Sequence, residues 1–208
     1  MAKRQYQQKE PEKKVQDNPM GTGRIEAFSD GVIAIIITIM VLELKIPEHA
    51  VHGDLWTEFL GPMAPKLTAY ALSFTIVAIY WVNHHAVMHS VRRATTRLLW
   101  SNNFLLFWLS LMPLATAFLG EHPFEFRAIV FYALLGFASA FAFAVLRWAC
   151  ISAQNTPQDN ATHLAAAKRS LFYACVNLVG IAAWFVSPVL ALISFLIPPI
   201  AYFLPKRS

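Results

Sequence analysis

Long, nearly uncharged apolar stretches dominate this chain of 208 residues. A helix that crosses the hydrocarbon core of a bilayer needs about 20 mostly apolar residues. Six stretches have or approach that length: 25–45, 66–88, 99–119, 126–149, 169–187 and 189–204. The whole chain is 57% hydrophobic and 14% charged, whereas soluble domains are about 25% charged. The sequence therefore predicts an all-α integral membrane protein with six transmembrane helices.

The two ends of the chain are predicted to lie outside this six-helix domain, which is expected to occupy residues 24–204. Residues 1–23 are polar, rich in Lys and Gln, and lack the apolar core of a signal peptide, so they are expected to form a flexible cytoplasmic tail. Residues 205–208 are expected to form a short cytoplasmic C-terminus. Within the last span, Pro198 and Pro199 are expected to break or kink the helix.

The distribution of basic residues predicts the orientation. Six spans place both ends of the chain on the same side of the membrane, and basic residues are enriched on the cytoplasmic side. With both termini inside, only Lys45, Lys66 and Arg127 of the 17 Lys and Arg residues would lie outside. Both termini are therefore predicted to be cytoplasmic. This placement also explains the net charge of +5 without nucleic acid as a partner.

The cysteines and histidines do not indicate a metal site or a disulfide framework. Cys150 and Cys175 each lie in or beside an apolar stretch. His85 and His89 are four residues apart on one helix face, next to His84. Hydrolytic zinc sites supply three protein ligands, and the sequence places no carboxylate or thiol near this pair. We therefore expect the histidines to supply hydrogen bonds at the cytoplasmic end of the second span.

The first span begins with polar residues that need partners. Arg24, Ser29 and Asp30 lie within seven residues at a membrane boundary, where such groups are costly unless they are paired. One interpretation is that Ser29 and Asp30 cap the helix N-terminus. The other is that the helix has already begun, which the apolar Ala27 and Phe28 favour.

The rest of the first span presents a regular face. At 100° per residue, four residues fall within an arc of about 100°: Ile35, Thr38, Ile39 and Leu42. Asp30 lies roughly opposite this arc. This face could pack against another helix, with the Thr38 hydroxyl bonded to its own backbone. It could equally line a narrow passage. Periodicity does not decide between the two interpretations.

Three motifs, in order along the chain, resemble those of the transmembrane protein 175 potassium channels. They are the run Arg24-x-x-x-Phe28-Ser29-Asp30, the run Trp81-Val82-Asn83-His84-His85, and Asn102 followed eleven residues later by Pro113. The resemblance implies a potassium-selective, leak-type channel without the Thr-Val-Gly-Tyr-Gly filter, and residues 24–204 would be its channel domain. It implies no enzyme activity and no cofactor.

The resemblance also implies an assembly and a location. One family repeat per chain is typical of the prokaryotic members, in which four chains surround one central pore lined by the first helix. We therefore expect a homotetramer in the plasma membrane of a prokaryote, crossing it several times. Its partners would be further copies of itself, membrane lipid and monovalent cations.

Specific roles follow from the resemblance, position by position. Ile35 matches the isoleucine constriction, Thr38 matches a threonine layer linked to selectivity, and Ile39 and Leu42 complete that face. No bound metal is expected, and potassium would pass the Thr38 layer. Four copies of Ile35 would narrow the pore and could close it by dewetting.

The signature residues would have a structural role. The resemblance implies that Arg24, Phe28, Ser29 and Asp30 attach the first helix to the second and third helices, within one subunit. The candidate partners are Trp81, His84 or His85, and Asn102.

The polar residues also permit a transport mechanism other than a potassium pore. Asp30 and the histidines could serve a proton-coupled secondary transporter or a proton-permeable channel. Against the transporter, the sequence has no inverted internal repeat and no pair of broken helices at matching positions.

Overall fold

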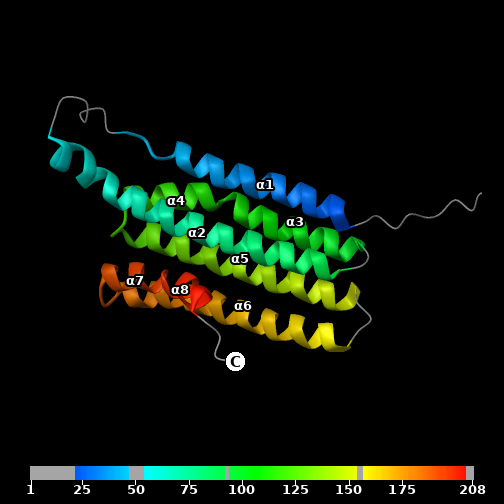
Figure 1. Cartoon of the computed structure of the whole chain (residues 1–208). Coiled ribbons are helices and arrows are strands. Elements are labelled where there is room, and N and C mark those ends of the chain that lie inside the picture. The colour runs from blue at the N-terminus through cyan, green and yellow to red at the C-terminus, as the bar shows by residue number, and fades with distance from the viewer. Residues whose placement is uncertain (1–21, 47–53, 92–93, 154–156, 205–208) are drawn as a thin grey trace, which may run out of the picture.

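The computed structural model describes residues 22–46, 54–91, 94–153 and 157–204, and these are helical with short connections (Figure 1). The elements are α1 (Thr22–Leu42), the π-helical turn η2 (Leu55–Leu60), α2 (Gly61–Ser90), α3 (Thr96–Ser110), α4 (Met112–Glu121), α5 (Phe126–Ala153), α6 (Pro157–Trp184), α7 (Pro188–Ser194) and α8 (Ile197–Phe203). None of the described residues forms a strand. The predicted all-α fold is confirmed.

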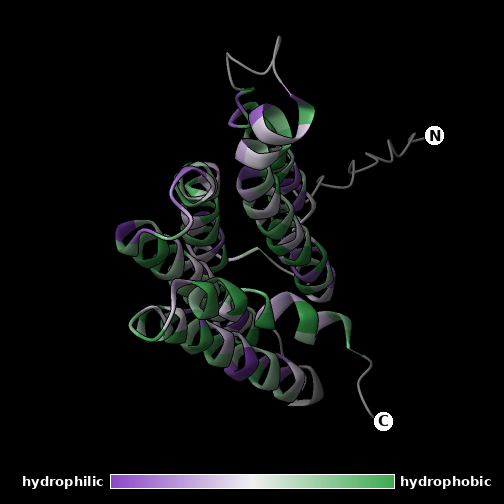
Figure 2. Cartoon of the chain, turned by 90° about the vertical axis from the view of Figure 1, so that its left-hand side faces the viewer, coloured by the Kyte–Doolittle hydropathy of each residue, from purple (hydrophilic) through white to green (hydrophobic). Residues whose placement is uncertain are grey.

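Among the described residues, five helical segments are long and apolar enough to cross a membrane: Thr22–Leu42, Leu55–Ser90, Thr96–Glu121, Phe126–Ile151 and Asn160–Trp184. The sixth predicted span corresponds to the shorter segment Pro188–Phe203. Hydrophobic residues extend along most of the helices in Figure 2. A bilayer offers no water to unpaired backbone groups, so helices that satisfy their own hydrogen bonds are the structure this composition favours.

Prolines interrupt two of the predicted spans. The last span is broken between α7 and α8, because α8 begins at Ile197, directly before Pro198 and Pro199; this break was expected from the sequence. The third span was predicted as one helix over 99–119, but it divides at Leu111 into α3 and α4. Pro113 has no N–H to donate to the carbonyl of Leu109, so the helix cannot continue regularly there.

Several helices extend beyond the apolar stretches that predicted them. The fifth span was expected at 169–187, but α6 begins at Pro157. Its first turns are polar, and hydropathy does not detect them, although proline is well suited to the first turn of a helix. Thr22 and Gly23 of the predicted tail already belong to α1. The rest of that tail, and residues 205–208, lie outside the described residues.

The helices pack in layers, with α1 at one edge of the bundle (Figure 1). It contacts α2, α3 and α4, whereas α5 contacts α3, α4 and α6, and α7 and α8 contact α6. The core lies where these layers meet, and it is mainly aliphatic. A polar pair joins two layers in it: the hydroxyl oxygens of Ser73 and Tyr132 lie 2.9 Å apart and both side chains are buried. This arrangement buries one face of α1 and leaves the other uncovered.

Gly180 allows a close approach between α6 and the C-terminal end of α7. A Cβ atom at this position would lie 2.8 Å from the Phe195 ring and from Ser194 Oγ, and both side chains are buried. Gly180→Ala should therefore destabilise the protein by about 1–3 kcal/mol through overpacking. Thermal unfolding in detergent measures this, with Gly23→Ala as the control, because nothing lies within 4 Å of a Cβ there. Equal melting temperatures for the two variants would contradict the prediction.

Candidate pore helix and its anchoring network

Helix α1 has a buried face and an exposed face. The buried face is formed by Ile25, Ser29, Ile33, Ile36 and Met40. Its members recur at three- and four-residue intervals, as one side of a helix requires. Of these five residues only Ser29 has a polar side-chain oxygen or nitrogen, and it needs a partner inside the protein.

The exposed face of α1 carries the four residues predicted to line a pore. Ile35 is 57% exposed, Ile39 41% and Leu42 74%, and Thr38 is exposed as well. The Thr38 hydroxyl donates a hydrogen bond to the Ile35 carbonyl oxygen at 2.9 Å. A hydroxyl oxygen that donates one bond keeps two lone pairs. The Thr38 hydroxyl therefore bonds to its own helix backbone, and its oxygen can still coordinate a cation that approaches from outside the helix.

A chain of hydrogen bonds connects the buried face of α1 to α3 and α2. The Ser29 hydroxyl donates to the Ile25 carbonyl oxygen at 2.8 Å, and Asn102 Nδ2 donates to Ser29 Oγ at 2.9 Å. Asn102 Oδ1 lies 2.7 Å from His84 Nε2. Ser29, His84 and Asn102 are all buried.

The atoms that can donate or accept determine the direction of these hydrogen bonds. The amide oxygen of Asn102 can only accept, so His84 donates from Nε2. The chain then runs in one direction from His84 through Asn102 and Ser29 to the α1 backbone, and each contact has a donor and an acceptor. We call these three side chains the anchoring network.

A second contact between α1 and α2 lies beside this network. Trp81 Nε1 donates to Asp30 Oδ1 at 2.9 Å. The bond joins the signature aspartate to the tryptophan of the second motif, so these two predicted partners are brought together. Asp30 is half-buried and Trp81 is 44% exposed.

Two signature residues lie outside the anchoring network. Arg24 is exposed, and it has no hydrogen bond or ion pair with any other described residue. Phe28 is 59% exposed and carries no polar group. Both lie on the side of α1 that a single chain leaves uncovered.

His85 is joined to Glu26, which is not among the predicted site residues. Glu26 Oε1 lies 2.6 Å from His85 Nδ1 and 4.0 Å from His89 Nδ1, and the two imidazole rings are 5.1 Å apart. The expectation that no carboxylate lies near these histidines is therefore wrong. Helical spacing could have found Glu26, because it lies one turn before Asp30 and so faces α2 as Asp30 does.

Among the described residues, one group could hold a metal ion: Glu26, His85 and His89. One ligand atom from each of them lies within 4.8 Å of the other two. Tetrahedral ligands about 2.0–2.1 Å from zinc would be roughly 3.3 Å apart. The 2.6 Å between Glu26 Oε1 and His85 Nδ1 is shorter than this and is close to the length of a charge-assisted hydrogen bond, about 2.7–2.9 Å. The observed geometry is therefore that of a bridge between α1 and α2.

Comparison with known proteins places these residues in a family. A family model described as "Endosomal/lysosomal potassium channel TMEM175" matches residues 24–113. A potassium channel of Chryseobacterium sp. (strain P1-3) is 39% identical over 194 residues, which cover 90% of this chain and 95% of that protein. The endosomal/lysosomal proton channel TMEM175 of Rattus norvegicus is 30% identical over 182 residues, covering 79% of this chain and 36% of the rat protein.

The fold comparison agrees with the sequence comparison. The crystal structure of a lysosomal potassium-selective channel TMEM175 homolog from Chamaesiphon minutus matches with a TM-score of 0.76 and 33% identity, covering 87% of this chain and 95% of that one. The residues matched by the family model include all of α2 and α3, and all of α1 except Thr22 and Gly23. The chain therefore belongs to the TMEM175 family of membrane ion channels and is not an enzyme.

Proposed function

We propose that this chain forms a potassium-selective, leak-type channel whose pore is lined by α1. The observation that carries the proposal is the uncovered face of α1, where Ile35, Thr38, Ile39 and Leu42 lie together while the opposite face is buried. Relatives named as potassium channels support potassium as the permeating ion. No cofactor is needed for this function.

The pore would combine an apolar constriction with a ring of hydroxyl oxygens. Ile35 from each subunit narrows the passage and can close it by dewetting, without a separate plug. One helical turn further, the Thr38 oxygens offer ligands to an ion that has lost part of its hydration shell. Potassium loses water at a lower free-energy cost than sodium, so a weakly polar constriction favours potassium. Selectivity of this kind is modest, because few fixed dipoles contact the ion.

The assembly that fits this function is a homotetramer in a prokaryotic plasma membrane, with both termini in the cytoplasm. One pore helix per chain cannot enclose a passage, so several copies must meet at the uncovered face of α1. The exposed Arg24 and Phe28 lie on that side of the helix and would be available for contacts between subunits. The excess of basic residues at one end of the spans supports the orientation.

The competing function is that of a proton-coupled carrier or a proton-permeable channel. The rat relative is named a proton channel, which supports the second of these. Planar-bilayer recordings of the purified protein in asymmetric KCl separate the alternatives. We expect unitary current steps whose reversal potential follows the potassium gradient. Saturable flux without steps would indicate a carrier, and a reversal potential that follows only the pH gradient would indicate a proton channel.

Asp30 should control assembly or gating more than ion preference. Asp30→Ala removes the acceptor of the Trp81 indole N–H and so frees the rotation of α1 against α2. We expect fewer tetramers or a lower open probability, with a nearly unchanged potassium-to-sodium permeability ratio in the remaining channels. Asp30→Asn keeps an acceptor oxygen and should be milder. Size-exclusion chromatography and bilayer recordings test this, and normal tetramers with normal currents in Asp30→Ala would contradict it.

A further inference from the structure

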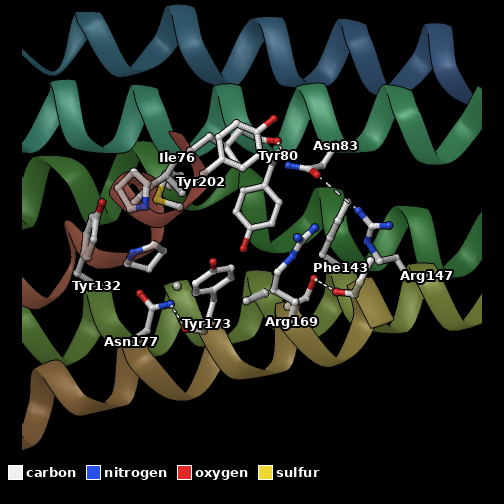
Figure 3. Close-up of a pocket in the computed structure, with 18 residues that line it drawn as sticks. Ile76, Tyr80, Asn83, Tyr132, Phe143, Arg147, Arg169, Tyr173, Asn177 and Tyr202 are labelled. Atoms are coloured by element: carbon white, nitrogen blue, oxygen red, sulfur yellow. Dashed lines mark hydrogen bonds between the residues drawn. The ribbon is translucent and has the colours of Figure 1, made fainter. Parts of the chain in front are cut away.

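A cavity of about 110 Å³ lies inside the subunit, on the far side of α2 from α1 (Figure 3). Residues of α2, α5, α6 and α8 form most of its wall. Its lining is largely apolar, but it contains two arginines, Arg147 of α5 and Arg169 of α6. Figure 3 shows both guanidinium groups at the same end of this space, with the hydroxyls of Tyr80 and Tyr173 directed into it. The pore does not account for this cavity.

Arg147 is incompletely satisfied. The residue is 8% exposed, and its guanidinium carbon lies 4.8 Å from the centre of the Phe143 ring. One weak hydrogen bond, of 3.5 Å, runs from its Nη2 to Asn83 Oδ1. Its buried Nε has no partner among the described residues. A charged group inside a membrane protein usually pairs with an opposite charge, and Arg147 has no such pair among the residues that the structure describes.

Arg169 is a second cation at the cavity. It lines the same cavity and is close enough to repel Arg147 electrostatically. None of the described residues that line the cavity is acidic, and neither arginine forms an ion pair with a described residue. Two cations beside one hollow, with no acidic side chain among the described lining residues, have the charge that an anion requires. Guanidinium groups are well suited to phosphate, because their donors match its oxygens.

The apolar surroundings indicate the source of the phosphate. A groove of mainly apolar side chains from α2 and α8 shares Pro199 with the cavity. The groove takes its α2 residues from Leu67 to Thr75, and the cavity continues along the same helix to Asn83. Together they follow roughly 24 Å of helix, more than half of the ~30 Å hydrocarbon core. One leaflet's acyl chain can lie along that length.

We infer that this cavity binds the phosphate of an anionic membrane lipid between Arg147 and Arg169, with an acyl chain in the groove between α2 and α8. Basic pockets between transmembrane helices recognise anionic headgroups in this way. The site lies within one subunit and does not depend on potassium conduction. A bound lipid would connect α2, α5, α6 and α8, and so would support the side of α2 opposite the anchoring network.

Native mass spectrometry of the purified, delipidated protein tests the site. The probes are dioleoyl phosphatidylglycerol, which is anionic, and dioleoyl phosphatidylcholine, which is not. We expect one phosphatidylglycerol per chain to be retained in preference to phosphatidylcholine. Arg147→Gln and Arg169→Gln should each weaken phosphatidylglycerol binding about fivefold. Lys168→Gln is the matched control, because Lys168 is an exposed cation beside Arg169 and does not line the cavity.

Equal retention of phosphatidylglycerol by the arginine variants and by Lys168→Gln would overturn the proposal. Glycerol phosphate at the same concentration distinguishes a lipid from a soluble phosphate: failure to compete supports the lipid, and full displacement contradicts it. Arg169 is exposed, so Arg169→Gln keeps the test decisive if the buried Arg147→Gln does not assemble. Size-exclusion profiles establish which variants are folded.

Discussion

Thr38→Val should lower the potassium-to-sodium permeability ratio about fivefold while the channel still assembles and conducts. Valine has nearly the shape of threonine but replaces the hydroxyl with a methyl group. Thr38 is exposed on α1, and its hydroxyl bonds to the Ile35 carbonyl oxygen of the same helix, so the substitution breaks no contact with another helix. A hydrogen bond of this kind contributes about 1 kcal/mol, and an ion contact of similar strength corresponds to a fivefold preference.

The matched variant for this prediction is Thr38→Ser, which keeps the hydroxyl and should keep the ratio. Reversal potentials under bi-ionic potassium and sodium conditions give the ratio for all three proteins. An unchanged ratio in Thr38→Val would place selectivity elsewhere. A loss of selectivity in both variants would mean that side-chain volume, and not the oxygen, determines it.

Asn102→Ala should destabilise the protein by about 2–4 kcal/mol. Asn102 lies at the centre of the anchoring network, bonded to Ser29 on one side and to His84 on the other. Its removal breaks two interhelical hydrogen bonds and leaves buried polar atoms unpaired. For a chain of this size the melting temperature should fall by roughly 5–15 °C.

Asn103→Ala is the control for Asn102→Ala, since Asn103 is the next residue along α3 and is exposed. Ser29→Ala should have an intermediate effect, because the bond between His84 and Asn102 remains. Thermal unfolding followed by fluorescence-detected size-exclusion chromatography measures all three. If Asn102→Ala and Asn103→Ala melted at the same temperature, the network would not hold α1 in place.

The helices of this protein could be predicted from hydropathy because their main determinant is local. A stretch such as Val32–Leu42 has one low-energy solution in a bilayer, a helix with an inward and an outward face. The break before Pro198 could also be predicted, because proline acts within its own helix. The division at Leu111 follows from the same chemistry at Pro113, but the long apolar run concealed it.

The contacts between helices were harder to predict, because they depend on the rotation of each helix. The resemblance selected Ser29, Asp30, Trp81, His84 and Asn102, and the structure joins these residues in two groups of contacts. Glu26 could not be selected in this way, because it falls at an unspecified position of the first motif, although it bonds to His85. Arg147 of α5 and Arg169 of α6 meet at one cavity only through tertiary packing. No sequence pattern predicts that they lie close together.

Cysteine accessibility tests the central claim, that the ion passes along the exposed face of α1. Ile35→Cys and Val189→Cys would each be made with Cys175→Ser, because Cys175 is the exposed native cysteine and Cys150 is buried. The two target residues are similarly exposed, 57% and 52%, but Val189 lies in α7, away from α1 (Figure 1). A cationic methanethiosulfonate added during bilayer recording should block the potassium current of Ile35→Cys and leave that of Val189→Cys unchanged. An unblocked current in Ile35→Cys, with labelling of that cysteine verified by mass spectrometry, would contradict a pore lined by α1.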